Sequence, residues 1–114
     1  MEKNWIEKLK EAIRIAKNKS MYLSAYEDED FSYTFNIDNK MDITFYSDCK
    51  KIHIRTPKGM LYSDCTLTDR DKLELKGLIL SIKEYKEDMA ISEFEEFISK
   101  KENKIVDIND LYDE

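Results

Sequence analysis

Glycine and proline are scarce in this chain, which has two glycines and one proline among 114 residues. Its loops are therefore expected to be short, or to be built from Asn, Asp and Ser. There are also only two cysteines, and no hydrophobic export signal follows Met1. Both facts point to reduced thiols and a cytoplasmic location.

Long hydrophobic runs and an excess of positive charge are missing too. The longest apolar runs, such as Leu78-Ile79-Leu80, are far too short to span a bilayer. The net charge of −6 argues against general nucleic-acid binding and against an anionic membrane surface. No catalytic or cofactor motif is recognisable, so we expect a protein that is not an enzyme and needs no cofactor.

What the chain does contain is enough apolar and aromatic material for a core, with 41% hydrophobic and 11% aromatic residues. A disordered chain would have little of either. The length fits one domain. We predict a single α+β domain over residues 1–101, followed by an acidic C-terminal tail over 102–114 that docks on the domain or extends from it.

The hydrophobic periodicity predicts a helix first and strands after it. A helix over residues 2–18 is indicated by Trp5, Leu9, Ala12 and Ala16 at helical spacing. The period then changes to two over residues 31–37, 41–46 and 51–55, with turn residues between them, which predicts an antiparallel meander. Residues 60–62 add a possible fourth strand, and residues 21–26 fit either a strand or an irregular link.

The last third of the sequence predicts two helices. Thr68 followed by Asp69 is a typical helix start, and apolar residues continue the pattern to about residue 87. Gly77 inside this helix suggests a close approach to the sheet. Ser92 with Glu95 forms a capping-box pattern, which predicts a second helix to about residue 101 with Phe94, Phe97 and Ile98 on its apolar side. The helices and the sheet would then form a two-layer sandwich.

Three residues are candidates for a metal or catalytic site. Cys49, His53 and Cys65 lack a Cys-x-x-Cys pair and a fourth ligand, which favours two unconnected thiols over a zinc site. His53 could act as a general base, but it shares strand parity with Lys51 and Arg55 and so belongs on an exposed face. The acidic run from Glu27 to Asp30 lacks the glycine of a calcium loop.

A cationic patch is predicted over residues 50–58, where Lys50, Lys51, His53, Arg55 and Lys58 gather. The helix-strand-strand-strand-helix order resembles that of double-stranded-RNA-binding domains. That family places lysines at the start of its last helix, where this chain has Thr68-Asp69-Arg70-Asp71. The favoured interpretation is an edge strand protected by charge from aggregation.

Segregated negative charge is the outstanding feature of the chain, because residues 84–114 hold eleven acids and four lysines. The acids fall in clusters accompanied by tyrosines. This pattern fits either a solvated surface or a docking face for a basic protein surface, where carboxylates steer the encounter and tyrosine supplies contact area. The predicted partner-binding residues are Glu27, Asp28, Glu29, Asp30, Glu84, Tyr85, Glu87, Asp88, Glu93 and Glu96.

The element order and the acidic stretch from Glu84 to Glu96 resemble small acidic anti-CRISPR proteins of phages and mobile elements. The resemblance covers roughly residues 2–101. It implies an inhibitor that blocks the nucleic-acid-binding groove of a CRISPR effector nuclease, with no direct contact to nucleic acid. Alternatives are an immunity or antitoxin protein that neutralises a basic toxin, a small structural protein that oligomerises, and a small enzyme that uses His53 and a cysteine.

Overall fold

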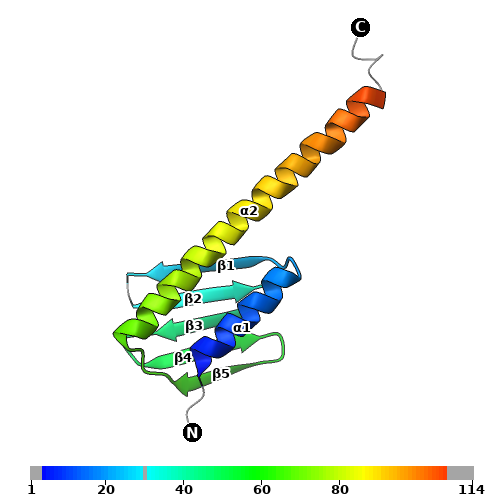
Figure 1. Ribbon diagram of the computed structural model, residues 1–114. Helices are drawn as coiled ribbons and strands as arrows, with labels where there is room; N and C mark the ends of the chain where they lie inside the picture. Colours follow the sequence, from blue (N-terminus) through cyan, green and yellow to red (C-terminus); the bar gives the residue numbers. More distant parts are fainter. Residues whose placement is uncertain (1–3, 30, 108–114) are drawn as a thin grey trace. The chain divides into compact units, whose positions relative to one another are not determined.

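Two helices and five strands make up the fold, in the order helix, five strands, helix (Figure 1). The structure is a computed structural model and describes residues 4–29 and 31–107. The elements are α1 (Trp5–Asn18), β1 (Leu23–Asp28), β2 (Ser32–Ile37), β3 (Met41–Tyr46), β4 (Lys51–Thr56), β5 (Gly59–Asp64) and α2 (Asp69–Asp107).

The sheet is an antiparallel meander in which every strand pairs with the next one along the chain. The predicted turn chemistry is confirmed at its hairpins. Asp38 and Asn39 both have positive φ, of 60° and 57°, between β2 and β3. That conformation defines a type I′ turn, whose twist matches the flanking strands, and Asn and Asp tolerate it better than most residues.

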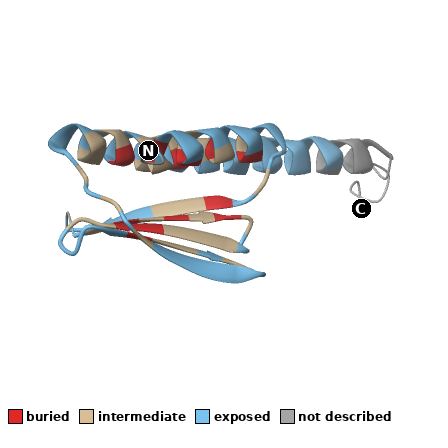
Figure 2. Ribbon diagram, turned by 90° about the horizontal axis from the view of Figure 1, so that it is seen from below, coloured by how far each residue is buried: buried red, intermediate tan, exposed pale blue. Residues whose placement is uncertain are grey.

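The core lies between one face of the sheet and the two helices, as the buried residues in Figure 2 show. Tyr33, Phe35 and Phe45 are fully buried from the sheet side, and the Phe35 and Phe45 rings meet edge to face at 6.3 Å. The helices contribute Ile6, Leu9, Ile13, Ala16, Leu75 and Ile82. The two-layer arrangement predicted from the sequence is therefore confirmed.

Each helix begins with a side-chain cap. The Asn4 side chain accepts a hydrogen bond from the Glu7 amide at 3.0 Å. At the start of α2 the Thr68 hydroxyl accepts from the Asp71 amide, and the Asp71 carboxylate accepts from the Thr68 amide, both at 3.0 Å. This reciprocal arrangement satisfies amides that have no partner inside the helix, and it confirms the predicted helix start at Thr68.

Side chains also join α1 to α2. Lys10 lies 2.7 Å from Glu74, and Lys17 donates a hydrogen bond to Ser81. The hydrogen bond that Lys10 donates to Glu74 raises the pKa of Lys10 above its ordinary value. On α1, Lys10 comes before Lys17, and on α2 their partners Glu74 and Ser81 follow in the same order and at the same spacing. α1 and α2 therefore run in the same direction across the sheet.

The strand count and the two C-terminal helices were predicted incorrectly. The ambiguous stretch around residues 21–26 contains the start of β1, and the residues beyond Gly59 form a complete strand, so the sheet has five strands. A single helix replaces the predicted pair, because no glycine or proline interrupts residues 78–107 and Ser92 remains inside the helix. Gly77 faces open space, with no atom within 4 Å of a Cβ built there, so it does not mark a close approach to the sheet.

The chain divides into two compact units, a sheet unit (residues 1–84) and a helical unit (residues 85–114). The sheet unit contains fifteen acidic and fifteen basic residues, so the whole net charge of −6 belongs to the helical unit. The predicted tail over residues 102–114 is helical as far as Asp107, and its last part lies outside the described residues.

Candidate functional site

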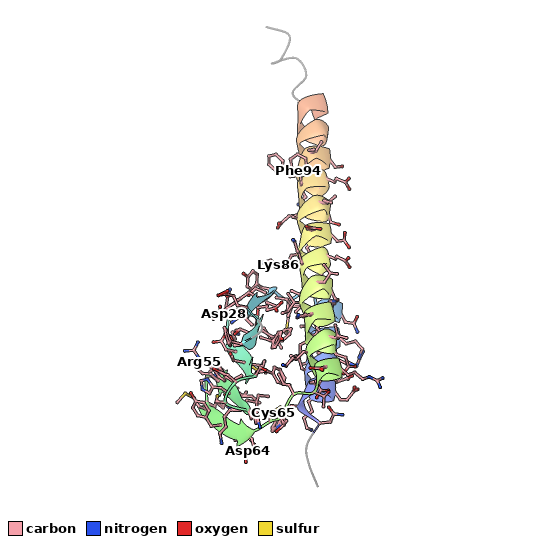
Figure 3. The ribbon with its side chains drawn as sticks, turned by 90° about the vertical axis from the view of Figure 1, so that its left-hand side faces the viewer. Asp28, Arg55, Asp64, Cys65, Lys86 and Phe94 are labelled. Carbon is pink, nitrogen blue, oxygen red and sulfur yellow. The ribbon has the colours of Figure 1, made fainter. Side chains whose placement is uncertain are left out.

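The part of α2 within the helical unit exposes large apolar side chains. Phe94 and Phe97 are 63% and 57% exposed, and Figure 3 shows Phe94 standing clear of the helix ribbon. At 3.6 residues per turn, five residues share one side of the helix. This apolar stripe consists of Ala90, Ile91, Phe94, Phe97 and Ile98.

The acids of this segment divide between the two sides of the helix. By helical spacing, Glu87 lies within the apolar stripe, and Asp88 and Glu95 lie along one border of it. Glu96 points the other way and lies 3.7 Å from Lys100, one turn further along. Of the acids predicted to bind a partner, Glu84, Glu87, Asp88 and Glu93 lie within or beside the stripe, whereas Glu96 does not.

Tyr85 does not serve as the exposed anchor that the sequence suggested. Its side chain is partly buried, and burial raises the pKa of its hydroxyl. Nine residues separate Tyr85 from Phe94, which places them on opposite sides of α2.

The acidic run at residues 27–30 belongs to the sheet unit. Glu27 and Asp28 end β1, and Glu27 lies 3.7 Å from Lys76 of α2. Glu29 has a φ of 46° in the turn that follows, and Asp30 lies outside the described residues. The predicted partner-binding residues therefore fall in two different compact units.

Sequence reasoning missed the apolar stripe as a surface, and it assigned Glu95 only to a helix cap. Phe94, Phe97 and Ile98 were assigned to the apolar side of a helix in the sandwich, but the structure leaves all three exposed. A signal was present: Ile91, Phe94 and Ile98 repeat at the three- and four-residue spacing of helices that pair with another helix or a groove.

Two residues of the cationic patch, Lys51 and Arg55, pair with acids on the outer face of the sheet. Lys51 lies 2.6 Å from Asp64 on β5, and Arg55 donates hydrogen bonds to Asp42 on β3. The hydrogen bond from Arg55, together with one from Asn36 at 2.7 Å, holds the pKa of Asp42 below its ordinary value. β4 lies between β3 and β5, so the interpretation of this stretch as an edge strand is wrong.

His53 lies in the middle of this outer face, on the side shared with Lys51 and Arg55, as its strand parity predicted. Its ring stacks on the Tyr62 ring, with centroids 4.3 Å apart and planes 9° from parallel. The Nε2 atom is buried and has no hydrogen-bond partner among the described residues. A general base needs an accessible nitrogen, and Nε2 is not accessible.

Cys49 and Cys65 are not joined by a disulfide. Cys49 is exposed in the turn before β4, and Cys65 is half-buried directly after β5. Across residues 4–29 and 31–107, no group of three His, Cys, Asp or Glu side chains is placed to hold a metal ion.

A cavity of about 730 Å³ lies in the sheet unit between the start of α1, β5 and the link to α2. Trp5, Ile6 and Leu67 line its apolar part, and Leu61, Ser63 and Cys65 line it from β5 and the residue after it. No histidine, lysine or arginine is among the described residues that line it.

Comparison with known proteins gives no assignment. No family model, curated protein or solved structure matches the chain. Among the described residues, no helix is both long and apolar enough to cross a membrane.

Proposed function

We propose that this chain is a non-enzymatic binding protein whose α2 segment, from Glu84 to Lys100, docks into an apolar groove rimmed by basic residues on a partner protein. One observation carries the proposal. The unit that holds the whole net charge of the chain also exposes Ile91, Phe94, Phe97 and Ile98 along one side of a helix.

Apolar side chains and charges have different tasks in such a complex. A helix that lays an apolar stripe into a groove derives most of its affinity from a few large anchors, here the two phenylalanines. Carboxylates at the border, here Asp88 and Glu95, accelerate the encounter with a basic rim and exclude acidic surfaces. The combination favours a partner protein over a second helical unit, since two such units would repel each other.

In its more specific form, the proposal is a phage or mobile-element inhibitor that blocks the nucleic-acid-binding groove of a defence nuclease. Such grooves are basic because they neutralise phosphates, so they offer the rim that the acids require. Charge mimicry of DNA alone would not need the exposed phenylalanines, so we expect apolar contacts in the complex as well.

The test is surface plasmon resonance between the full-length protein and purified, guide-loaded CRISPR nucleases. We expect binding that weakens as salt rises, because charges are screened beyond about 8–10 Å near physiological ionic strength. Phe94→Ser should weaken binding strongly. Met89→Ser is the matched control, because Met89 is an exposed apolar residue on the opposite side of the same segment.

The outcomes separate the alternatives. Binding of a basic toxin domain with the same dependence on Phe94 would support an immunity protein. Equal loss of binding for the Phe94 and Met89 variants, or binding indifferent to both, would show that the apolar stripe is not the interface.

A further inference from the structure

β5 is an open edge of the sheet, because it pairs with β4 and with no other strand of the described chain (Figure 1). Three consecutive apolar residues on it are exposed: Met60 by 69%, Leu61 by 41% and Tyr62 by 65%. Neither Lys, Arg nor Pro occurs between Gly59 and Asp64. An apolar edge without such protection is a template for another strand.

The opposite edge is protected. β1 ends in Glu27 and Asp28, and Glu27 forms an ion pair with Lys76 of α2. Charged side chains on an edge strand oppose its pairing with another strand.

The free backbone groups of β5 can be assigned. The Cys65 amide donates to the Lys50 carbonyl at 2.9 Å, so residue 65 bonds toward β4. In an antiparallel pair the bonding direction alternates along a strand. Gly59, Leu61 and Ser63 therefore bond toward β4, and the amides and carbonyls of Met60, Tyr62 and Asp64 face the open edge.

We propose that β5 pairs antiparallel with the β5 of a second copy, about a two-fold axis that passes through Leu61. Leu61 then faces Leu61 of the second copy on the helix-covered side. On the outer side, Met60 faces Tyr62 of the second copy, and the free amides and carbonyls of these two residues form hydrogen bonds with each other. The two-fold axis repeats the same contact between Tyr62 and Met60 of the second copy. The two sheets become one continuous sheet.

Chemical complementarity supports this register. It brings Lys58, in the turn before β5, beside Asp64 of the second copy, whose side chain is 90% exposed. The contact occurs twice because a two-fold interface is reciprocal. Met60 and Tyr62 form a favourable sulfur–aromatic pair.

Net charge and surface shape also permit the pairing. The sheet unit has equal numbers of acidic and basic residues, so net-charge repulsion between two copies comes from their helical units and not from the units that pair. Leu61 lines the cavity that Trp5, Ile6 and Leu67 also line. The second copy's Leu61 would reach the mouth of this cavity and cover apolar surface that is open in the single chain.

The dimer should be weak and concentration-dependent. One added strand on each side buries less area than a standard interface of about 1,600 Å². Its main-chain and apolar contacts are little affected by salt, in contrast to the salt-sensitive docking proposed for α2.

Disulfide trapping tests the register. In a Cys49→Ser, Cys65→Ser background, Leu61→Cys should form an intermolecular disulfide under mild oxidation. The two Leu61 residues face each other on the axis without a backbone hydrogen bond between them. The Cα atoms of such a pair are about 4.5 Å apart, which suits a disulfide. Tyr62→Cys should not cross-link in this register, and Ala25→Cys in the middle of β1 is the control for the other edge.

Sedimentation equilibrium of the full-length protein tests the dimer without cross-linking. We expect reversible dimers, which Lys58→Glu weakens by placing like charges opposite each other. Lys58→Glu combined with Asp64→Lys should restore association. Lys58 is exposed, so its substitution tests the interface without unfolding the sheet.

Two results would overturn the proposal. One is a protein that stays monomeric up to about millimolar concentration, where even weak interfaces associate. The other is a cross-link that forms as readily from Ala25→Cys or Tyr62→Cys as from Leu61→Cys. Neither result bears on docking through α2, and Phe94→Ser should leave the β5 dimer intact, so the two proposals fail independently.

Discussion

Lys100 lies 3.7 Å from Glu96, one turn apart on the side of α2 that faces away from the apolar stripe. This pair accounts for one acid of the C-terminal cluster without any partner. It separates Glu96 from the acids that lie within or beside the stripe, and it therefore predicts unequal effects of charge reversal.

Reversing charge at the border of the stripe should slow partner binding. We expect Asp88→Lys with Glu95→Lys to reduce the association rate about tenfold or more at low salt, since steering charges accelerate encounter by at least that factor. Glu96→Lys with Ser92→Lys and Ser99→Lys is the matched control, because all three residues are exposed on the other side of the helix and the net charge changes by the same amount. Equal effects of the two variants in stopped-flow binding would argue for steering by net charge alone.

The exposed phenylalanines should contribute little to folding. Phe94→Ser should leave the free energy of unfolding within about 0.5 kcal/mol of the original value, as for other surface positions. Phe45→Ala, in the fully buried core, should cost about 3–5 kcal/mol. Urea denaturation measures both. A large loss for Phe94→Ser would mean that this ring packs against the protein and is not available to a partner.

Thr68 and Ser92 should differ in their contribution to stability. Thr68→Ala removes the cap of α2 and should destabilise the protein by about 1 kcal/mol. Ser92 lies inside a continuous helix, where alanine is a better helix former than serine. Ser92→Ala should therefore leave stability unchanged or slightly higher. Circular dichroism during denaturation measures both. A cost at Ser92 similar to that at Thr68 would indicate a helix start there, and so two helices.

The Asp42–Arg55 pair should make the free energy of unfolding depend on pH in the acidic range. The pKa of Asp42 is depressed in the folded protein, first by the hydrogen bond from Arg55 and then by Asn36. Its stabilising contribution is therefore present above the unfolded pKa of about 3.9 and is lost as pH falls through the lower, folded value. Asp42→Asn should reduce the dependence of unfolding free energy on pH below about 4. If Asp42→Asn leaves the pH dependence of the unfolding free energy unchanged, the Asp42–Arg55 pair does not contribute to that dependence.

Much of the fold could be predicted from the sequence because its signals are local. Alternation of apolar residues identified β2, β3 and β4, and Asp38-Asn39 marked the turn between the first two of these. Thr68 with Asp71 marked the start of α2. Each signal acts within a few residues, so it survives in any context that allows the element to form.

Other features escaped because they depend on distant neighbours. β1 and β5 were uncertain from sequence since their side chains are less regularly patterned, and their pairing with β2 and β4 makes them strands. The charges of β4 look like a cationic patch in the sequence. In the sheet, Asp42 and Asp64 from the strands on either side neutralise Arg55 and Lys51.

The sequence by itself determined the class of the fold, its turns and helix starts, and the concentration of negative charge after residue 84. Only the tertiary structure decided that Phe94 and Phe97 are exposed and that β5 is an unprotected edge. Helical or strand periodicity shows which side of an element is apolar, but not whether another part of the chain covers that side. Burial is a property of two surfaces that meet, so it is settled when the whole chain folds.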